Sequence, residues 1–329
     1  MTQFHSRRNV IASAAALGAA LGIPALAFAQ STFPDKSKVI KGITPSPAGS
    51  TVDTLARAYA QAMSEILGAN VVIDNRPGAE GVIGIQAAKS APADGYTIMF
   101  TSVSTQSVNP HLFKQLTYDP IKDFTPLGGT MKVPFMMIAG PNFPFKNVKD
   151  FVVAAKAAPG KYSYASVSST TRLAGEMFAQ AAGVKLLNIP YKSFADLISD
   201  TLANRVNFFF ADGAAMVPYA AQGMRGVAAC TKTPIAKFPD MPLMANEGVP
   251  FQLEGWHAAY APANTPAAVL TVLRDALRKA EGSKVVKDYL TSGGNEPMNL
   301  IGDDFARFEK AEYDKWGKAV RDAGLAGTL

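Results

Sequence analysis

Hydrophobic and polar positions follow one order that recurs along the chain. A run rich in β-branched and aromatic residues comes first, then a turn of Gly, Ser and Pro. Apolar residues three or four positions apart follow, which is the period of a helix. In the first unit, residues 38–44 predict a strand, and Val52, Leu55, Tyr59 and Met63 predict the buried face of a helix. Strands that alternate with helices are typical of an α/β protein with mostly parallel sheets.

The same alternation continues to the end of the chain. Residues 133–139 form an apolar run, and the triplet Phe208, Phe209 and Phe210 indicates a strand that is buried on both faces. Further strands are predicted at 71–74, 96–101, 162–165, 186–189, 206–211, 227–231 and 256–261. Helices are predicted at 78–89, 148–158, 173–182, 195–203, 214–222, 266–281 and 303–323.

The N-terminal segment has the pattern of a secretory signal peptide. Two arginines precede a long uncharged run, and the small-x-small pattern Ala-Phe-Ala predicts cleavage after Ala29. Pro24 and this cleavage pattern argue against a membrane anchor. We therefore expect a signal peptide at 1–29 and a mature protein in the periplasm. The motif SRRNVI at 6–11 also fits twin-arginine export, so the sequence leaves that route and general secretion open.

Composition narrows the class of protein. The 329 residues are 48% hydrophobic and 18% charged, which excludes a disordered chain and leaves room for two domains with cores of their own. Cys230 is the single cysteine, so the chain is not a disulfide scaffold. The net charge of +6 comes without a basic block or an aromatic-interleaved basic stripe, which argues against a nucleic-acid partner.

Residues suited to catalysis or metal binding are sparse. Gly78, Gly81 and Gly84 have the spacing G-x-x-G-x-x-G inside a helical pattern, which is not the dinucleotide fingerprint G-x-G-x-x-G. His111 and His257 are far apart in the sequence, and neither belongs to a recognisable catalytic triad or zinc motif. We expect neither an enzyme, nor a metal site, nor a cofactor.

Loops rich in hydroxyl groups follow three of the predicted strands, at 46–51, 101–104 and 166–172. Ligands bind at the carboxyl edge of parallel sheets, where helices also present unpaired N–H groups and the positive end of their dipole. Arg172, which ends the third loop, adds a guanidinium suited to a carboxylate or phosphate. The pattern predicts a small-anion site, although Ser and Thr at such positions also serve as helix caps and turn formers.

Short stretches in a fixed order over the whole mature chain carry a resemblance to one family. They are PSPAGSTVD at 45–53, DNRPG at 74–78, APADGYT at 91–97, NP at 109–110, YDP at 118–120, PGKY at 159–162, LAGE at 173–176, IPYK at 189–192, FPDMP at 238–242, NEG at 246–248 and KWGK at 315–318. Through them the chain resembles the secreted solute receptors of tripartite tricarboxylate transporters, the Bug or TctC family.

This resemblance implies a type 2 periplasmic-binding-protein fold, with two α/β lobes and a ligand cleft between them. Lobe 1 is expected to combine residues 30–130 with 254–329, and lobe 2 to comprise 131–253. The implied function is that of a monomeric, non-enzymatic receptor, which captures a small carboxylate and delivers it to the permease of a tripartite transporter. The ligand is expected to be an aliphatic or aromatic dicarboxylate, an acidic amino acid or a nicotinate-like acid, and we favour a dicarboxylate because two anion sites are expected to face each other. The alternative is a periplasmic enzyme or sensor module that acts on a small organic acid with the same two-lobed fold.

The resemblance also maps a binding site onto this chain. Two loops of lobe 1 are implied to hold one carboxylate, partly through ordered waters, with Asp53 supporting the first loop. The residues concerned are Pro47, Ala48, Gly49, Ser50, Ser102 and Ser104. Lobe 2 is expected to contribute the other half of the site. Its candidate residues are Ser166, Ser168, Ser169, Thr170, Arg172, Tyr191 and Asp212.

The chain departs from the family pattern before the LAGE helix. The loop there is about two residues shorter, and Arg172 takes the position of a common histidine. This suggests an ion pair with a second ligand carboxylate, unless Arg172 instead pairs with Asp212 or Glu176. Asp212 matches a position that is often acidic in the family. It could accept a hydrogen bond from a ligand ammonium or hydroxyl group, or orient Arg172 or Tyr191.

Overall fold

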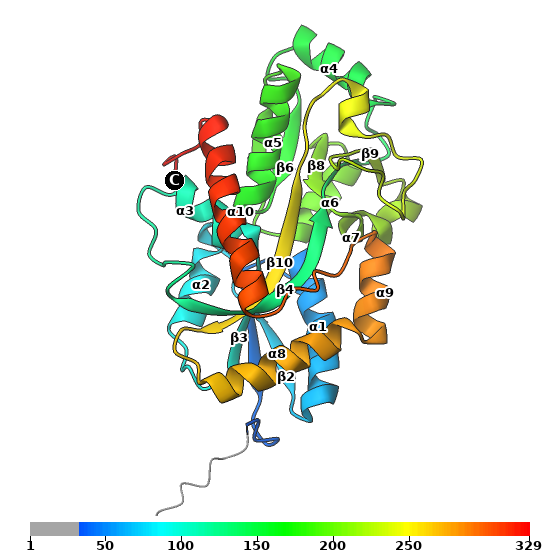
Figure 1. The fold of residues 1–329 in the computed structure, drawn as a ribbon. Helices are drawn as coiled ribbons and strands as arrows, with labels where there is room; N and C mark the ends of the chain where they lie inside the picture. Colours follow the sequence, from blue (N-terminus) through cyan, green and yellow to red (C-terminus); the bar gives the residue numbers. More distant parts are fainter. Residues whose placement is uncertain (1–32) are drawn as a thin grey trace, which may run out of the picture. The chain divides into compact units, whose positions relative to one another are not determined.

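The computed structural model describes residues 33–329, so the predicted signal peptide at 1–29 lies outside the described residues. Two five-stranded sheets organise the chain (Figure 1). The first has the order β2-β1-β3-β10-β4 and the second the order β7-β6-β8-β5-β9. The strands of the first sheet are β1 (Ile40–Thr44), β2 (Val71–Asn75), β3 (Thr97–Ser102), β4 (Phe124–Pro134) and β10 (Glu254–Pro262). Those of the second are β5 (Met136–Ala139), β6 (Ser163–Ser166), β7 (Leu187–Pro190), β8 (Phe208–Ala211) and β9 (Arg225–Ala229).

The two sheets share one pattern of pairing. Strand β1 runs parallel to β2 and β3, and β6 runs parallel to β7 and β8. Each sheet then adds antiparallel pairs through one strand, β10 in the first and β5 in the second. This architecture confirms the prediction of an α/β protein with two lobes. The prediction of mostly parallel sheets is wrong, because each sheet has as many antiparallel pairs as parallel ones.

Helices cover the sheets with their apolar faces. In α1 (Thr51–Leu67), Leu55, Tyr59 and Met63 are buried as the spacing predicts. Helix α1 packs against α8 and α9, whereas α10 packs on β4 and on a π-helical turn, Ser104–Val108, that follows β3. The helices are α1, α2 (Val82–Lys89), α3 (Asn109–Leu112), α4 (Val148–Ala157), α5 (Ser169–Ala182), α6 (Phe194–Leu202), α7 (Gly213–Met216), α8 (Ala267–Glu281), α9 (Lys284–Gly293) and α10 (Asp303–Asp322). Along the part of the chain that the structure describes, no helix is long and apolar enough to cross a membrane.

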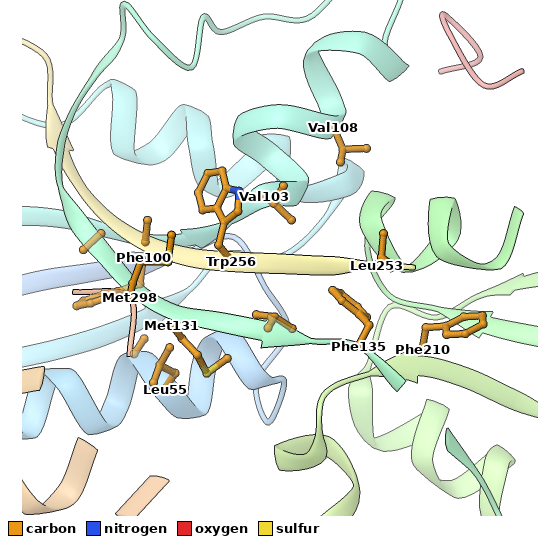
Figure 2. Packing of buried hydrophobic residues seen from close by; sticks show 14 of the residues in the cluster. Leu55, Phe100, Val103, Val108, Met131, Phe135, Phe210, Leu253, Trp256 and Met298 are labelled. Atoms are coloured by element: carbon orange, nitrogen blue, oxygen red, sulfur yellow. The ribbon is translucent and has the colours of Figure 1, made fainter. Parts of the chain in front are cut away.

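The chain passes between the sheets at Phe135, which separates β4 from β5. Its carbonyl accepts a hydrogen bond from the Cys230 amide (2.8 Å), and the Cys230 carbonyl accepts one from the Leu253 amide (2.8 Å). This short ladder connects the two lobes. Figure 2 shows Phe135, Leu253 and Trp256 among the buried side chains that run along β4 and β10. The apolar core therefore continues through the crossover.

The structure differs from the sequence analysis at three places. The apolar run 133–139 divides into two strands that belong to different sheets. Helix α5 begins at Ser169, four residues before its predicted start, because the Ser168 side chain caps it by accepting a hydrogen bond from the Thr171 amide. Helix α9 was not predicted, since only a few apolar positions, such as Val286 and Leu290, mark its buried face.

Helix α9 contacts α1 in the first lobe and α7 in the second. The contact with α7 is a close approach of two backbones. A Cβ atom on Gly213 would lie 2.3 Å from the Gly293 carbonyl oxygen and 2.6 Å from the ring of Phe238. Glycine is therefore needed at Gly213 for α7 and α9 to meet.

We predict that Gly213→Ala lowers the free energy of unfolding by about 1–3 kcal/mol, because a backbone carbonyl cannot move aside as a flexible side chain would. Denaturant unfolding of the mature protein measures this change. The matched control is Gly282→Ala, where the nearest atom to a new Cβ is the Lys279 carbonyl oxygen at 3.4 Å. Equal unfolding free energies for the two variants would show that the α7–α9 contact relaxes freely.

Candidate functional site

A cavity of ≈ 70 Å³ lies between the two lobes. It forms where β1, β3, β6 and β8 end, so the carboxyl edges of both sheets face the same space, as is typical of ligand sites in α/β proteins. At about 10–15 Å³ for each ordered water, the volume corresponds to about five water molecules. The polar lining comprises Ser46, Ser50, Thr51, Ser102, Ser104, Ser168, Thr170, Thr171, Asp212 and His257.

The rest of the lining is apolar and comes mostly from the crossover and the second sheet. Phe135, Phe210 and Trp256 belong to this wall, and Figure 2 shows Phe135 at the crossover, Trp256 on β10 and Phe210 on β8. The other apolar lining residues are Pro47, Val52, Val103, Val133, Ala165, Val167, Phe194, Leu197, Phe209 and Ala211. The cavity therefore suits a small molecule with an apolar body and polar groups at its ends.

The loop after β1 is held by Asp53, whose side chain is only 2% exposed. Its carboxylate accepts hydrogen bonds from the Gly49 amide (2.9 Å) and from Asn75 Nδ2 (2.8 Å), and it forms an ion pair with Arg57 (3.0 Å). These contacts confirm the expected supporting role of Asp53. Ser50 occupies the N-cap position of α1, but its side chain does not cap the helix and instead donates to the Pro47 carbonyl (2.6 Å). Because Ser50 and Thr51 line the cavity, the positive end of the α1 dipole lies at its wall.

Hydroxyl groups of the two lobes meet across the cavity. Ser104, just after β3, contacts Thr170 in the first turn of α5, with 2.7 Å between their hydroxyl oxygens. Ser169 also donates a hydrogen bond to the Ser104 carbonyl (3.4 Å). The two lobes are therefore in direct polar contact at the N-terminus of α5.

Among the lining residues, Asp212 carries the one carboxylate. It is 1% exposed, and its Oδ2 accepts a hydrogen bond from Asn295 Nδ2 (2.7 Å). Its Oδ1 has no partner among residues 33–329. Burial raises the pKa of Asp212 to about 6, and the hydrogen bond from Asn295, together with the nearby backbone N–H groups of Asp212 and Ala215, opposes that rise only in part. A strongly perturbed pKa at a group that lines a cavity is a common mark of a functional site.

His257 on β10 is the second ionisable group of the lining and is 6% exposed. Burial lowers its pKa to about 3, so the ring is neutral at physiological pH, and its Nδ1 has no partner in the described chain. No lysine or arginine of the described residues lines the cavity. An anionic ligand would therefore be bound by hydroxyls, backbone N–H groups and helix ends. The structure also shows no cluster of metal-binding side chains within residues 33–329.

The residues that the sequence identifies as ligand-binding divide into two groups in the structure. The first group lines the cavity and comprises Pro47, Ser50, Ser102, Ser104, Ser168, Thr170 and Asp212. The second group lies outside the lining and comprises Ala48, Gly49, Ser166, Ser169, Arg172 and Tyr191.

Several residues of the second group have other partners. Ser166 donates to Asn188 Oδ1 (2.8 Å), and the Tyr191 hydroxyl donates to Asp200 (2.8 Å). Arg172 lies in the first turns of α5, where its charge acts on Glu80 and opposes the rise in the Glu80 pKa that burial causes. Between the described side chains of Arg172, Asp212 and Glu176 the structure contains no ion pair.

Sequence reasoning does not identify His257, which lines the cavity, or Asn295, which contacts the lining residue Asp212. The sequence offers His257 only as a metal ligand or catalytic base, and no motif around it supports either role. Asn295 follows the unpredicted helix α9 and lies 83 residues from Asp212 along the chain. A local sequence pattern cannot predict a contact between residues that lie so far apart along the chain.

Comparison with known proteins places the chain among transport receptors. The profile of the family described as the tripartite tricarboxylate transporter family receptor matches residues 55–325. A UPF0065 protein of Bordetella bronchiseptica is 32% identical, over 93% of this chain and 90% of its own length. A solved structure described as a periplasmic transporter has a TM-score of 0.83 and 34% identity, over 88% of this chain and 98% of its own. The R. palustris protein Rpa4515, solved with adipate, has a TM-score of 0.83 and 30% identity, over 87% and 97%.

We predict that Asp212→Asn stabilises the ligand-free protein at pH 7. The pKa of Asp212 rises from 3.8 to about 6 on folding, so the folded state binds the extra proton between these values. The stability of the wild type therefore falls as the pH rises from about 4 to about 6, by about 3 kcal/mol. Asn removes this loss, and its amide oxygen still accepts the hydrogen bond from Asn295.

Denaturant unfolding at several pH values measures the difference between Asp212→Asn and wild type. We expect it to be largest at pH 7 and to shrink toward zero below pH 4. Asp200→Asn is the control, because the hydrogen bonds from Arg205 and Tyr191 lower the pKa of the exposed Asp200, so its pH dependence has the opposite sign. A stability difference for Asp212→Asn that does not change with pH would contradict the assignment.

Proposed function

The chain belongs to the tripartite tricarboxylate transporter receptor family, whose members are periplasmic solute-binding proteins, and from this premise we propose that it captures one small carboxylate and delivers it to a membrane permease. The observation that carries the proposal is the cavity between the lobes, where hydroxyl groups and two helix N-termini converge from both sheets. The related R. palustris protein Rpa4515, solved with adipate, supports a carboxylate as the ligand.

The ligand carboxylate binds at the first-lobe side of the cavity. Ser50 and Thr51 begin the 17-residue helix α1, and Ser102 ends β3 beside them. The unpaired N–H groups at the start of a helix and the positive end of its dipole bind an anion without a cationic side chain. Water molecules supply further bridges, because small side chains leave room for them.

Delivery to the permease requires that the loaded form differ from the empty one. The contacts Ser104–Thr170 and Ser169–Ser104 join the lobes beside the cavity, and the crossover at Phe135 provides a point about which the lobes rotate. Closure of two domains around a ligand is a common switching motion. We propose that a permease of the tripartite type recognises the closed, loaded form of the monomer.

We predict that the mature protein binds at least one small carboxylate at one-to-one stoichiometry and leaves it chemically unchanged. A thermal-shift screen against mono- and dicarboxylic acids identifies the ligand. A ligand at 100 times its Kd stabilises the protein by about 2.7 kcal/mol, which shifts the melting temperature measurably. Recovery of a converted product after incubation with a trace of protein would indicate an enzyme instead.

We predict that Ser102→Ala weakens binding of this carboxylate about tenfold, the loss expected for one hydrogen bond to a charged group. The Ser102 Oγ accepts a hydrogen bond from the Ser104 amide, so its own proton remains available to the ligand. Isothermal titration measures the change in Kd. Ser283→Ala is the matched control, because the Ser283 Oγ also accepts a hydrogen bond from a backbone amide but does not line the cavity. Equal Kd values for the Ser102→Ala variant and wild type would move the carboxylate site away from the end of β3.

A further inference from the structure

We propose that Asp212 binds a protonated amino group of the ligand, so that the transported solute is a small amino carboxylic acid. The proposal rests on the proposed function and names the solute class within it. It is carried by the geometry of one residue, Asp212, which belongs to the cavity lining on the side of the second lobe and whose Oδ1 is a buried acceptor without a partner in the described chain.

One of the two carboxylate oxygens of Asp212 lacks a hydrogen-bond partner in the described chain. Asn295 Nδ2 donates to Oδ2 at 2.7 Å and so fixes the orientation of the carboxylate. Oδ1 is buried and unpartnered within the described chain, and a buried acceptor of this kind is unfavourable unless a donor reaches it. Asn295 acts here as a positioning residue, while Oδ1 is the atom available to a ligand.

The charges around Asp212 are also uncompensated. His257 from β10 is neutral because burial lowers its pKa. Tyr289 from α9 is likewise neutral, since burial and the charge of Asp212 raise its pKa, and its hydroxyl donates to the Thr51 carbonyl. Arg57 is paired with Asp53. The ionised form of Asp212 therefore lies beside the cavity without a cation from any of these elements.

This charge pattern selects among carboxylate ligands. A dicarboxylate would bring a second negative group toward the ionised Asp212, which disfavours it. A ligand hydroxyl would satisfy Oδ1 as a donor but would leave the charge uncompensated. An ammonium group does both, because it donates three hydrogen bonds and neutralises the carboxylate. The ligand carboxylate then binds at the start of α1, and its ammonium group binds at Asp212.

The test compares matched acids with and without an amino group on the full mature protein. The pairs are β-alanine with propionate, γ-aminobutyrate with butyrate, and L-aspartate with succinate, with L-malate as the hydroxyl analogue of aspartate. We expect isothermal titration to show the amino member of the best-fitting pair binding at least tenfold more tightly than its partner. The three pairs differ in the length of the carbon chain, so that one acid that is too short or too long for the cavity does not decide the result.

The variant Asp212→Asn keeps the size of the side chain and the hydrogen bond from Asn295 but removes the charge. We expect it to weaken the amino acid at least tenfold and to change the affinity of the matched acid by less than threefold. Asp200→Asn, which removes an exposed carboxylate of the same lobe, should leave both affinities unchanged. At pH 6 the binding of the amino acid should also release protons from the wild type but not from Asp212→Asn, as titration in buffers of different ionisation enthalpy detects.

The outcomes separate this proposal from the proposed function. If acids without an amino group bind as tightly as their partners, or if Asp212→Asn weakens both equally, Asp212 is not an ammonium site, although the protein remains a carboxylate receptor. A preference for malate over aspartate would assign a hydroxyl group to Oδ1 and would also overturn the proposal. If no acid of either kind, in this set or in the wider screen, binds the wild type, the receptor function itself is wrong.

Discussion

The crossover between the two sheets sets the geometry on which the site depends. A single residue, Phe135, separates β4 from β5, and the ladder through Phe135, Cys230 and Leu253 ties the outgoing chain to the returning one. Because these connections are short and hydrogen-bonded to each other, the carboxyl edges of the two sheets stay on the same side of the crossover when the lobes rotate about it. Loops that are distant in sequence therefore line one cavity, and the Phe135 side chain is part of its wall.

The cavity combines features that stabilise a ligand with one that destabilises the empty protein. Hydroxyl groups and helix ends cost little when water fills the space, since water can satisfy them. Asp212 is different, because burial raises its pKa and its Oδ1 is unpartnered in the described chain. Proteins retain such unfavourable groups at sites of function and compensate for them elsewhere. The continuous apolar core along β4 and β10 supplies that compensation here.

Much of the fold could be predicted from the sequence, because the alternation of strand and helix patterns is local. The loops after β1, β3 and β6 could be placed at the site for the same reason, whereas Asp212 at the end of the Phe-rich strand was identified only through the family resemblance. Details within those loops could not. The sequence does not show that the Gly49 amide is taken by Asp53, or that Arg172 is drawn into the first turns of a helix capped by Ser168.

The least predictable part of the site is also the part that joins the lobes. Asn295 reaches Asp212 only because α9 lies against α7, and that approach is possible only because Gly213 and Gly293 carry no side chains. Helix α9 packs on α1 at the same time, and its Tyr289 hydroxyl donates to the Thr51 carbonyl at the start of that helix. One C-terminal helix therefore contacts both ends of the cavity. A ligand that bridges the start of α1 and Asp212 would join the same two parts of the protein that α9 contacts. Ligand binding and closure of the lobes would therefore favour each other.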